Sequence, residues 1–413
     1  MVDLSRRRDA VDRLDRFLWI CYLNRKVSRQ GCNPSETGVI FTMASTSSEL
    51  HIIRVSKSFQ TGRRAHVPVL KEATLWLRRG EAISVLGPTG CGKSTLLRLI
   101  AGLDQPDSGS ITFDGEAVDH LSPYQRGIGF VFQNYALYPH FKVHGNIAFY
   151  FRLRRWTPDA VDDKVMETAA IMGMGFEALL GRMPRNLSSG EKQRVALARC
   201  ISHNPRVLLL DEPFSNLDAS LRLKTRSEVK QLVERFGLTT VFVTHDQSEA
   251  VAMGHRLAIM HAGEIIQVGT FQELYQQPLN QFVAGFLGSP PMHFFNGWRQ
   301  GDDLVFDIGQ TRLRAPVPHH LHHRLAPDSR LQIGLRAEHF YVAEANAPLS
   351  LPCDIDAVEM LVSDAAQLVY VKHGSTRFCA KLNLQQTLRP HDTLWLGLAP
   401  EHIHVFDADG KRL

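Results

Sequence analysis

The sequence predicts an α/β domain with a parallel β-sheet, followed by a smaller all-β domain. From about residue 50 to 290, short apolar runs rich in β-branched residues alternate with helical patterns. Such runs, separated by helices, are typical of a parallel sheet covered on both faces. After Pro290 and Pro291 the sequence changes to short alternating segments broken by Gly, Pro and Asp, which favours an all-β fold. A chain of 413 residues is long enough for two or three domains.

The composition is that of a globular protein, because hydrophobic residues make up 44% and charged residues 22%. No stretch approaches the roughly 18 to 20 uninterrupted apolar residues of a spanning helix, so a membrane role would need partner chains. The net charge of +5 is spread along the chain and does not by itself indicate a partner. The cysteines are scattered and form no C-x-x-C pair, as expected of reduced thiols in the cytoplasm; they are Cys21, Cys32, Cys91, Cys200, Cys353 and Cys379.

Residues 1–48 are predicted to form a disordered N-terminal extension. The apolar run from Phe17 to Leu23 is too short for a signal sequence, and no small-residue cleavage site follows it. We hypothesise that residues 1–42 come from an upstream start codon and that translation begins at Met43. Finding Met1 or Val2 at the N-terminus of natively expressed protein by mass spectrometry would contradict this.

A glycine-rich loop follows the apolar strand predicted over 82–86. Its sequence, GPTGCGKST, fits the pattern G-x-x-x-x-G-K-[ST] and opens a helix predicted over 94–101. Backbone N–H groups of such a P-loop surround phosphate oxygens, while Lys93 reaches the β- and γ-phosphates and the Ser94 hydroxyl binds Mg²⁺. The predicted nucleotide-binding residues are Gly87, Pro88, Thr89, Gly90, Cys91, Gly92, Lys93, Ser94 and Thr95. Cys91 is expected to make the protein sensitive to thiol-alkylating reagents, with protection by ATP, but to take no part in the chemistry.

Two acids follow a second apolar strand, predicted over 207–210. Asp211 and Glu212 have the arrangement of a Walker B element. In this arrangement Asp211 orients Mg²⁺, and Glu212 positions and polarises the attacking water. Together with the P-loop, these acids predict an enzyme that hydrolyses a nucleoside triphosphate.

The segment from Leu187 to Arg199, LSSGEKQRVALAR, resembles the signature motif of ABC ATPases. The commonest form of that motif reads LSGGQ, so Ser189 and Glu191 depart from it. The resemblance implies that Ser188 and Gly190 contact the γ-phosphate of ATP held by the opposite subunit of a head-to-tail dimer. We expect the two departures to reduce nucleotide affinity at most.

Other segments resemble the remaining ABC elements in their usual order. Gln133 resembles the Q-loop glutamine, which reaches Mg²⁺ and senses the membrane partner. Asp218 resembles the D-loop residue at the dimer interface, and His245 the switch histidine that holds γ-phosphate and water. Phe59 occupies the place of an aromatic that stacks on adenine, although Gln60 to Pro68 is expected to form an unusually long loop. The resemblance thus implies Lys93, Glu212 and His245 as catalytic residues and Ser94, Gln133 and Asp211 as metal ligands.

The predicted boundaries are residues 49–288 for the ABC ATPase domain, with a helical subdomain at about 134–190, and 289–413 for the β domain. Within the latter, LQIGLRAEHFYV (331–342) and LWLGLAPEHIHV (394–405) align without gaps. One strand–turn unit is therefore predicted to be used twice in a compact, OB-like barrel. The alternative considered is a helical dimerisation domain.

The tail is similar to that of the ATPase subunits of carbohydrate importers of the maltose and glycerol-3-phosphate type. The similarity lies in GSPPM (288–292) and GLRAEH (334–339), where Leu335 and Ala337 are mild departures. It implies a regulatory domain, ATP and Mg²⁺ as ligands, and a homodimer at the cytoplasmic face of the inner membrane. The implied partners are two permease subunits and an extracytoplasmic solute-binding protein, with no nucleic acid. Importers of polyamines, iron or sulfate, exporters, and soluble nucleic-acid-linked ABC ATPases are the alternatives.

The run His319-His-Leu-His-His323 invites a metal-site interpretation. No acidic or cysteine partner lies beside it in the sequence, and prolines precede it. A solvated surface loop is therefore the prediction.

Overall fold

The computed structural model describes residues 47–61, 65–326, 328–384 and 388–413. The hypothesis about Met43 and nearly all of the predicted extension lie outside these residues. Ser47 and Ser48, which end that extension, are buried. The Ser47 hydroxyl donates to the Gly237 carbonyl at 2.6 Å, and the Ser48 backbone N–H donates to the Arg206 carbonyl. These two serines are therefore part of the folded domain.

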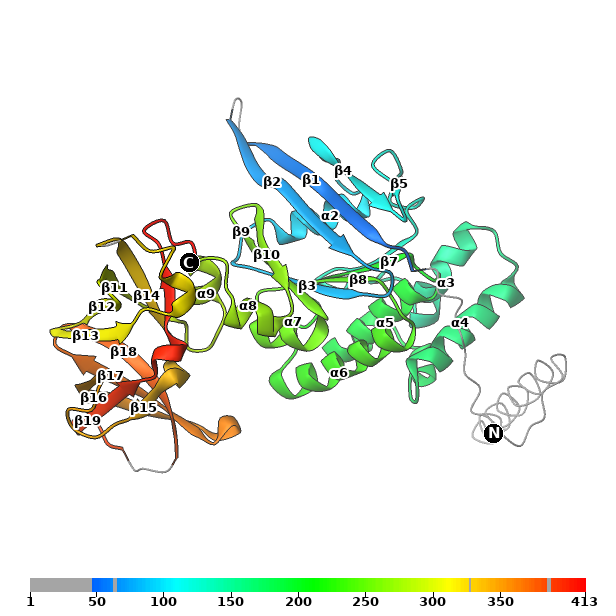
Figure 1. The fold of residues 1–413 in the computed structure, drawn as a ribbon. Helices are drawn as coiled ribbons and strands as arrows, with labels where there is room; N and C mark the ends of the chain where they lie inside the picture. Colours follow the sequence, from blue (N-terminus) through cyan, green and yellow to red (C-terminus); the bar gives the residue numbers. More distant parts are fainter. Residues whose placement is uncertain (1–46, 62–64, 327, 385–387) are drawn as a thin grey trace, which may run out of the picture. The chain divides into compact units, whose positions relative to one another are not determined.

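The first domain combines a mostly parallel sheet, an antiparallel sheet and helices (Figure 1). Its strands are β1 Leu50–Thr61, β2 Ala65–Leu77, β3 Ala82–Leu86, β4 Ser108–Phe113, β5 Glu116–Ala117, β6 Ile128–Val131, β7 Val207–Asp211, β8 Thr240–Thr244, β9 Arg256–His261 and β10 Glu264–Gly269. Its α-helices are α2 Lys93–Ala101, α3 Val143–Leu153, α4 Pro158–Met172, α5 Ser189–Ile201, α6 Ala219–Arg235, α7 Gln247–Met253, α8 Phe271–Gln276 and α9 Gln281–Phe286. Short 3₁₀ turns, η1 Glu177–Leu179 and η2 Pro184–Asn186, precede α5.

The central sheet has the order β10-β9-β3-β8-β7-β6, and only β10 runs antiparallel to its neighbour. Strands β3 and β8 are buried along their whole length, as their continuous apolar sequences predict. Helix α2 shares one hydrophobic core with strands of both sheets, through Leu96, Leu97 and Ile100. The carboxyl ends of β3, β7 and β8 lead into the predicted P-loop, the two acids and His245, which therefore converge at one edge.

The antiparallel sheet β2-β1-β4-β5 corrects one expectation. Gln60 to Pro68 does not form a long loop, because β1 extends to Thr61 and β2 begins at Ala65. The two strands pair along this segment, with Phe59 opposite Val67 and Gln60 opposite His66. Side chains such as Phe59 and Val67 favour a pleated ladder, so a long hairpin replaces the expected loop.

The second domain consists of two five-stranded antiparallel sheets, β13-β12-β11-β14-β20 and β15-β19-β16-β17-β18. Its strands are β11 His293–Gln300, β12 Asp303–Ile308, β13 Thr311–Pro316, β14 Arg330–Leu335, β15 Phe340–Val342, β16 Ser350–Leu361, β17 Ala366–His373, β18 Thr376–Asn383, β19 Thr393–Leu398 and β20 His404–Phe406. Its 3₁₀ turns are η3 His319–Leu321, η4 Ala337–His339, η5 Val362–Asp364 and η6 Pro400–His402. A large apolar cluster with members from both sheets forms most of its core, and a smaller one contains Ala337, Leu368 and Cys379. The domain is all-β, as predicted.

The predicted repeat forms two equivalent strand–turn–strand units, β14-η4-β15 and β19-η6-β20. The units pair reciprocally, because β14 pairs with β20 while β15 pairs with β19. Gly334 lies opposite His404, and Gly397 at the equivalent position lies opposite Tyr341. A Cβ on Gly397 would come within 2.5 Å of the Tyr341 ring, so this glycine makes room for the aromatic side chain.

No helix in the described part of the chain combines the length and the apolar character that crossing a membrane requires.

Candidate functional site

The loop between β3 and α2 has the backbone geometry that a phosphate-binding loop needs. Gly90 and Gly92 have φ angles of 81° and 109°, which L side chains rarely adopt. Gly87 has no room for a side chain, because a Cβ there would lie 2.2 Å from the Met260 carbonyl oxygen. Gly92 also caps the N-terminus of α2, whose partial positive charge favours an anion. The loop therefore fits a polyphosphate.

Lys93 lies buried at the first position of α2, with 6% of its surface exposed. Its Nζ donates to the carbonyl oxygens of Gly87 at 2.8 Å and Pro88 at 3.0 Å. The ammonium thus bonds neutral oxygens of its own loop, and a phosphate oxygen would be a stronger acceptor because of its charge.

The hydroxyl of Ser94 donates to Oδ1 of Asp211 at 3.1 Å, which joins the P-loop helix to the end of β7. Burial, and then the charge of Glu212, raise the pKa of Asp211. A hydroxyl and a carboxylate at this spacing are oxygen ligands of the kind that Mg²⁺ prefers, and a cation would offset the cost of burying the carboxylate. The two side chains therefore fit a magnesium ion next to the phosphate loop.

Glu212 is surrounded by polar side chains from two other segments. Its Oε1 lies 3.1 Å from Nδ1 of His245, and its Oε2 accepts from the Gln133 amide at 3.4 Å. The Gln133 amide is also 3.4 Å from the Ser215 hydroxyl. Glu212 has a φ of 43°, which is uncommon for a residue other than glycine and is frequent at functional sites. The structure thus brings together Gln133, Glu212 and His245.

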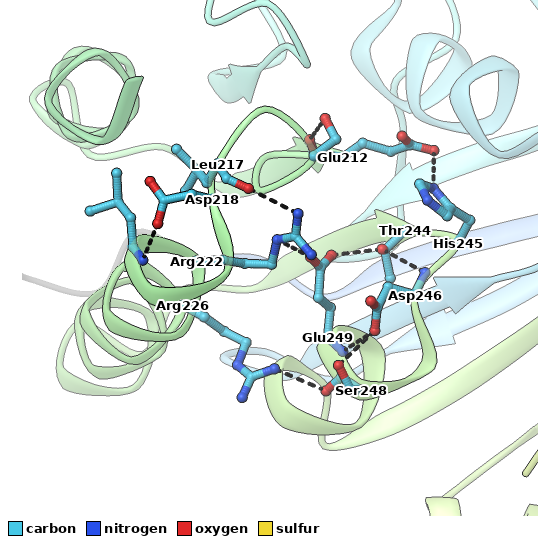
Figure 2. A network of polar contacts seen from close by, with 12 residues as sticks. Glu212, Leu217, Asp218, Arg222, Arg226, Thr244, His245, Asp246, Ser248 and Glu249 are labelled. Carbon is cyan, nitrogen blue, oxygen red and sulfur yellow. Dashed lines mark hydrogen bonds and ion pairs between the residues drawn. The ribbon is translucent and has the colours of Figure 1, made fainter. Parts of the chain in front are cut away.

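A second polar network, which the sequence did not predict, contains the two neighbours of His245 in the chain, Thr244 and Asp246 (Figure 2). Thr244 Oγ1 donates to Oε2 of Glu249 at 2.8 Å and accepts from the Asp246 backbone N–H at 3.0 Å. Glu249 is buried, and burial followed by the charge of Asp246 raises its pKa. Arg222 of α6 lies 3.8 Å from Oε1 of Glu249 and donates to the Leu217 carbonyl at 2.9 Å. Thr244 and Asp246, which flank His245, are therefore connected through Glu249 and Arg222 to α6 and to the loop before it.

Ser188 is the N-cap of α5, as expected for a serine at the start of a phosphate-facing helix. Its hydroxyl accepts from the Glu191 N–H at 3.2 Å, and the Glu191 carboxylate accepts from the Ser188 N–H at 2.8 Å. This reciprocal pair is a capping box, and Arg182 pairs with Glu191 at 3.3 Å. The departure at Glu191 therefore stabilises the helix start. The Ser188 O–H and the N–H groups of Ser189 and Gly190 remain as donors to an anion.

Asp218 and Phe59 lie apart from the hydrogen bonds around Glu212. Asp218 caps α6 and accepts from the Leu221 N–H and the Ser220 hydroxyl, both at 2.9 Å, and these contacts lower its pKa. The Phe59 ring is 38% exposed and has the Lys57 ammonium 5.5 Å from its centroid. Within the described residues, the side-chain hydrogen bonds of Ser188 and Asp218 and the cation contact of Phe59 involve residues outside the P-loop.

The Cys91 thiol is buried, and burial raises its pKa despite the nearby Lys93. Because the thiolate is the reactive form, we expect alkylation to be slow at neutral pH and to speed up as pH rises. Rates measured with a maleimide at increasing pH, with and without ATP, check this. An ATP-insensitive rate at Cys91 would contradict the predicted protection.

The first three residues of the histidine run form the turn η3, in which Leu321 is buried while His319 and His320 are exposed, and His323 beyond the turn is exposed as well. Across the described residues, no group of three or more His, Cys, Asp or Glu side chains is placed to hold a metal ion. The structure thus adds no support for a metal site in this run.

Comparison with known proteins extends these observations over both domains. Residues 70–215 match the ABC transporter family, and residues 333–406 match the TOBE domain family. The sn-glycerol-3-phosphate import ATP-binding protein UgpC of Chromohalobacter salexigens is 39% identical over 367 residues, covering 88% of this chain and 95% of that protein. UgpC of Escherichia coli is 39% identical over 346 residues, which cover 84% of this chain and 95% of that protein. The trehalose/maltose import ATP-binding protein MalK of Thermococcus litoralis is 40% identical over 355 residues, covering 83% and 94%.

Proposed function

Because this chain belongs to the family of import ATP-binding proteins of ABC transporters, and is thus an ATPase coupled to transport, we propose that it powers import of a carbohydrate or glycerol-phosphate-type solute. The solute class rests on the names of the relatives, which import sn-glycerol-3-phosphate, trehalose or maltose. The proposed domains are an ATPase domain that includes Ser47 and Ser48 and ends at residue 288, and a regulatory β domain at 289–413. The protein would act at the cytoplasmic face of the inner membrane, with two permease subunits and a solute-binding protein.

The observation that carries the proposal is the convergence of Glu212, His245 and Gln133 beside the P-loop. Two copies would hold two ATP molecules between them, each on the P-loop of one copy and the Ser188 and Gly190 donors of the other. Phe59 would stack on adenine, and Asp218 would lie at the interface. Among the described residues, the Ser188 hydroxyl and backbone N–H form hydrogen bonds with Glu191 and not with the P-loop of the same chain, which supports this head-to-tail arrangement.

In each site, Glu212 would accept a hydrogen bond from the attacking water and orient it, while His245 would hold both the water and the γ-phosphate. Lys93 would exchange the two loop carbonyls for phosphate oxygens, so that its charge offsets the charge that develops on them. Ser94 and Asp211 would hold Mg²⁺ together with Gln133. The bound ion would neutralise negative charge on the β- and γ-phosphates.

A mixing experiment tests the paired site. Lys93→Met disables the P-loop and Ser188→Arg disables the signature motif. A homodimer of either variant therefore has no working ATP site. A mixed dimer regains one site with an intact P-loop and signature. Random mixing makes half of the dimers mixed, each with one of two sites, so about one quarter of wild-type ATPase activity should return. Failure of the mixture to exceed the separate variants would contradict the shared site.

The solute class needs the membrane complex. We expect the affinity-tagged chain to co-purify from native membranes with two integral-membrane subunits. In proteoliposomes, the ATPase rate of this complex should rise when its solute-binding protein carries sn-glycerol-3-phosphate or maltose. Co-purification without membrane subunits, or stimulation only by a polyamine, iron or sulfate, would overturn the proposed solute class or role.

Arg222 is proposed as a positioning residue for His245, because it supports the buried Glu249 that holds Thr244. Arg222→Gln should lower kcat about tenfold or more, since small displacements of catalytic groups are costly, and leave KM for ATP unchanged. Arg226→Gln is the matched control: Arg226 lies on the same helix and donates to the Ser248 carbonyl at 3.4 Å, but it does not contact Glu249. Equal kcat values for the two variants would show that the Arg222 contact does not position His245.

A further inference from the structure

A cavity of about 530 Å³ lies where α8 meets the β domain. Its walls come from α8, from both repeated strand–turn–strand units, from η3 and from the end of the chain. The lining side chains used below are Tyr275, Arg336, His339, His402, His404 and Arg412. A volume of this size is typical of small-molecule sites.

The cavity is lined by two arginine side chains together with Glu401, and the charge of Glu338 partly opposes the effect of burial on the pKa of Arg336. The Arg336 guanidinium is 1% exposed and donates to the carbonyls of Leu287 at 2.7 Å and Tyr275 at 2.9 Å. Arg412 donates to the Gln276 carbonyl at 2.8 Å. Within the described residues, neither arginine is in an ion pair, and burial lowers the pKa of both. Buried cations usually have a charged partner within ion-pair distance, so the buried Arg336 beside the half-buried Arg412 favours an anionic ligand.

The same cavity contains buried nitrogens with no hydrogen-bond partner in the described chain, namely Arg336 Nε, His339 Nδ1 and His404 Nδ1. Unpaired buried polar groups are rare in native proteins and call for an explanation. The His339 and His402 rings, from equivalent positions of the two units, stack with centroids 4.1 Å apart. Burial and the neighbouring arginines lower the pKa of His404 to about 3, so its ring is neutral and can donate one N–H to a ligand.

We propose that this cavity binds a small anion through a phosphate or carboxylate group, held by Arg336, Arg412 and the His339 and His404 nitrogens. A metal ion does not fit, because the two guanidinium groups would repel it. The ligand would contact α8 of the ATPase domain and strands of the β domain together, so its binding would strengthen the attachment of one to the other. This site goes beyond the proposed function and does not depend on it.

Calorimetric titration of the full chain tests the site, with saturating Mg·ADP present so that the P-loop cannot take up the probe. The probes are inorganic phosphate and succinate, in separate titrations that distinguish the two anion types. We expect saturable binding of at least one probe with a Kd of about 1 mM or tighter. The absence of saturable binding of both probes would overturn the proposal.

Two variants locate the binding. Arg412→Gln removes one cation. His404→Phe removes a hydrogen-bond donor but keeps an aromatic ring opposite Gly334. The equivalent pair, Tyr341 opposite Gly397, shows that an aromatic ring fits opposite a glycine at this position. Each variant should weaken binding about tenfold, or about 1.4 kcal/mol. Arg314→Gln, which removes the same charge from an exposed position of β13, should leave the Kd unchanged. Equal affinities of wild type and both cavity variants would place the anion elsewhere and overturn the proposal.

Discussion

Glu212→Gln should bind ATP as the wild type does and hydrolyse it about 100- to 10,000-fold more slowly, the range by which a positioned acid or base contributes to catalysis. The amide keeps the size of the side chain and one acceptor oxygen, but it loses the charge that polarises water. In the wild type, the Glu212 carboxylate lies 3.1 Å from His245 Nδ1 and 3.4 Å from the Gln133 amide, and the amide of the variant would occupy the same place. Phosphate release and nucleotide fluorescence, measured on one preparation, separate turnover from binding.

The matched control is Glu234→Gln, which makes the same chemical change at an exposed position of α6, where Glu234 pairs with Lys230 at 3.8 Å. It should change neither binding nor turnover, because exposed pairs contribute little. Hydrolysis by Glu212→Gln within a few fold of the wild type would show that another group orients the water.

Lys93→Met should weaken ATP binding at least about 100-fold, because it removes charge-assisted hydrogen bonds to phosphate from a buried position, each worth about 1.5–3 kcal/mol. The methionine keeps much of the aliphatic chain of a side chain that is only 6% exposed, so packing around α2 should survive. The Gly87 and Pro88 carbonyls lose their donor, which would cost some stability in the nucleotide-free protein.

Equilibrium binding of a fluorescent ATP analogue measures this loss, and Lys230→Met on the exposed face of α6 is the control. Thermal unfolding without nucleotide shows whether the fold is retained. A Kd for ATP within threefold of the wild-type value would contradict the role of Lys93.

The parts of the site that could be predicted are those in which adjacent residues carry the signal. The P-loop and the two acids after β7 follow buried apolar strands, so their sequence alone places them at one sheet edge. The capping box could also have been predicted, because Ser188 and Glu191 have the S-x-x-E spacing that marks a helix start. The same glutamate also reads as a departure from the usual glutamine of the signature motif, which hides its capping role.

Other features depend on contacts between distant segments and leave no local pattern. Arg222 and Glu249 lie on two helices, and neither has a sequence neighbour that marks it as a partner of the other. The hairpin over Gln60 to Pro68, which replaces the expected long loop, is another such feature. The paired strand supplies the ladder that local propensity did not indicate, as cross-strand packing often does.

The reciprocal pairing of the two repeated units means that they meet as the halves of an isologous dimer do, although they belong to one chain. In a true homodimer every substitution appears on both sides of the axis. Here each side can change alone: Arg336 has Ala399 as its counterpart, and His404 has Tyr341. The stacked pair His339 and His402 keeps the twofold relationship, while the residues around it break it. As a result, the cavity receives an arginine, Arg336, from the first unit and a histidine, His404, from the second, rather than the same side chain from both.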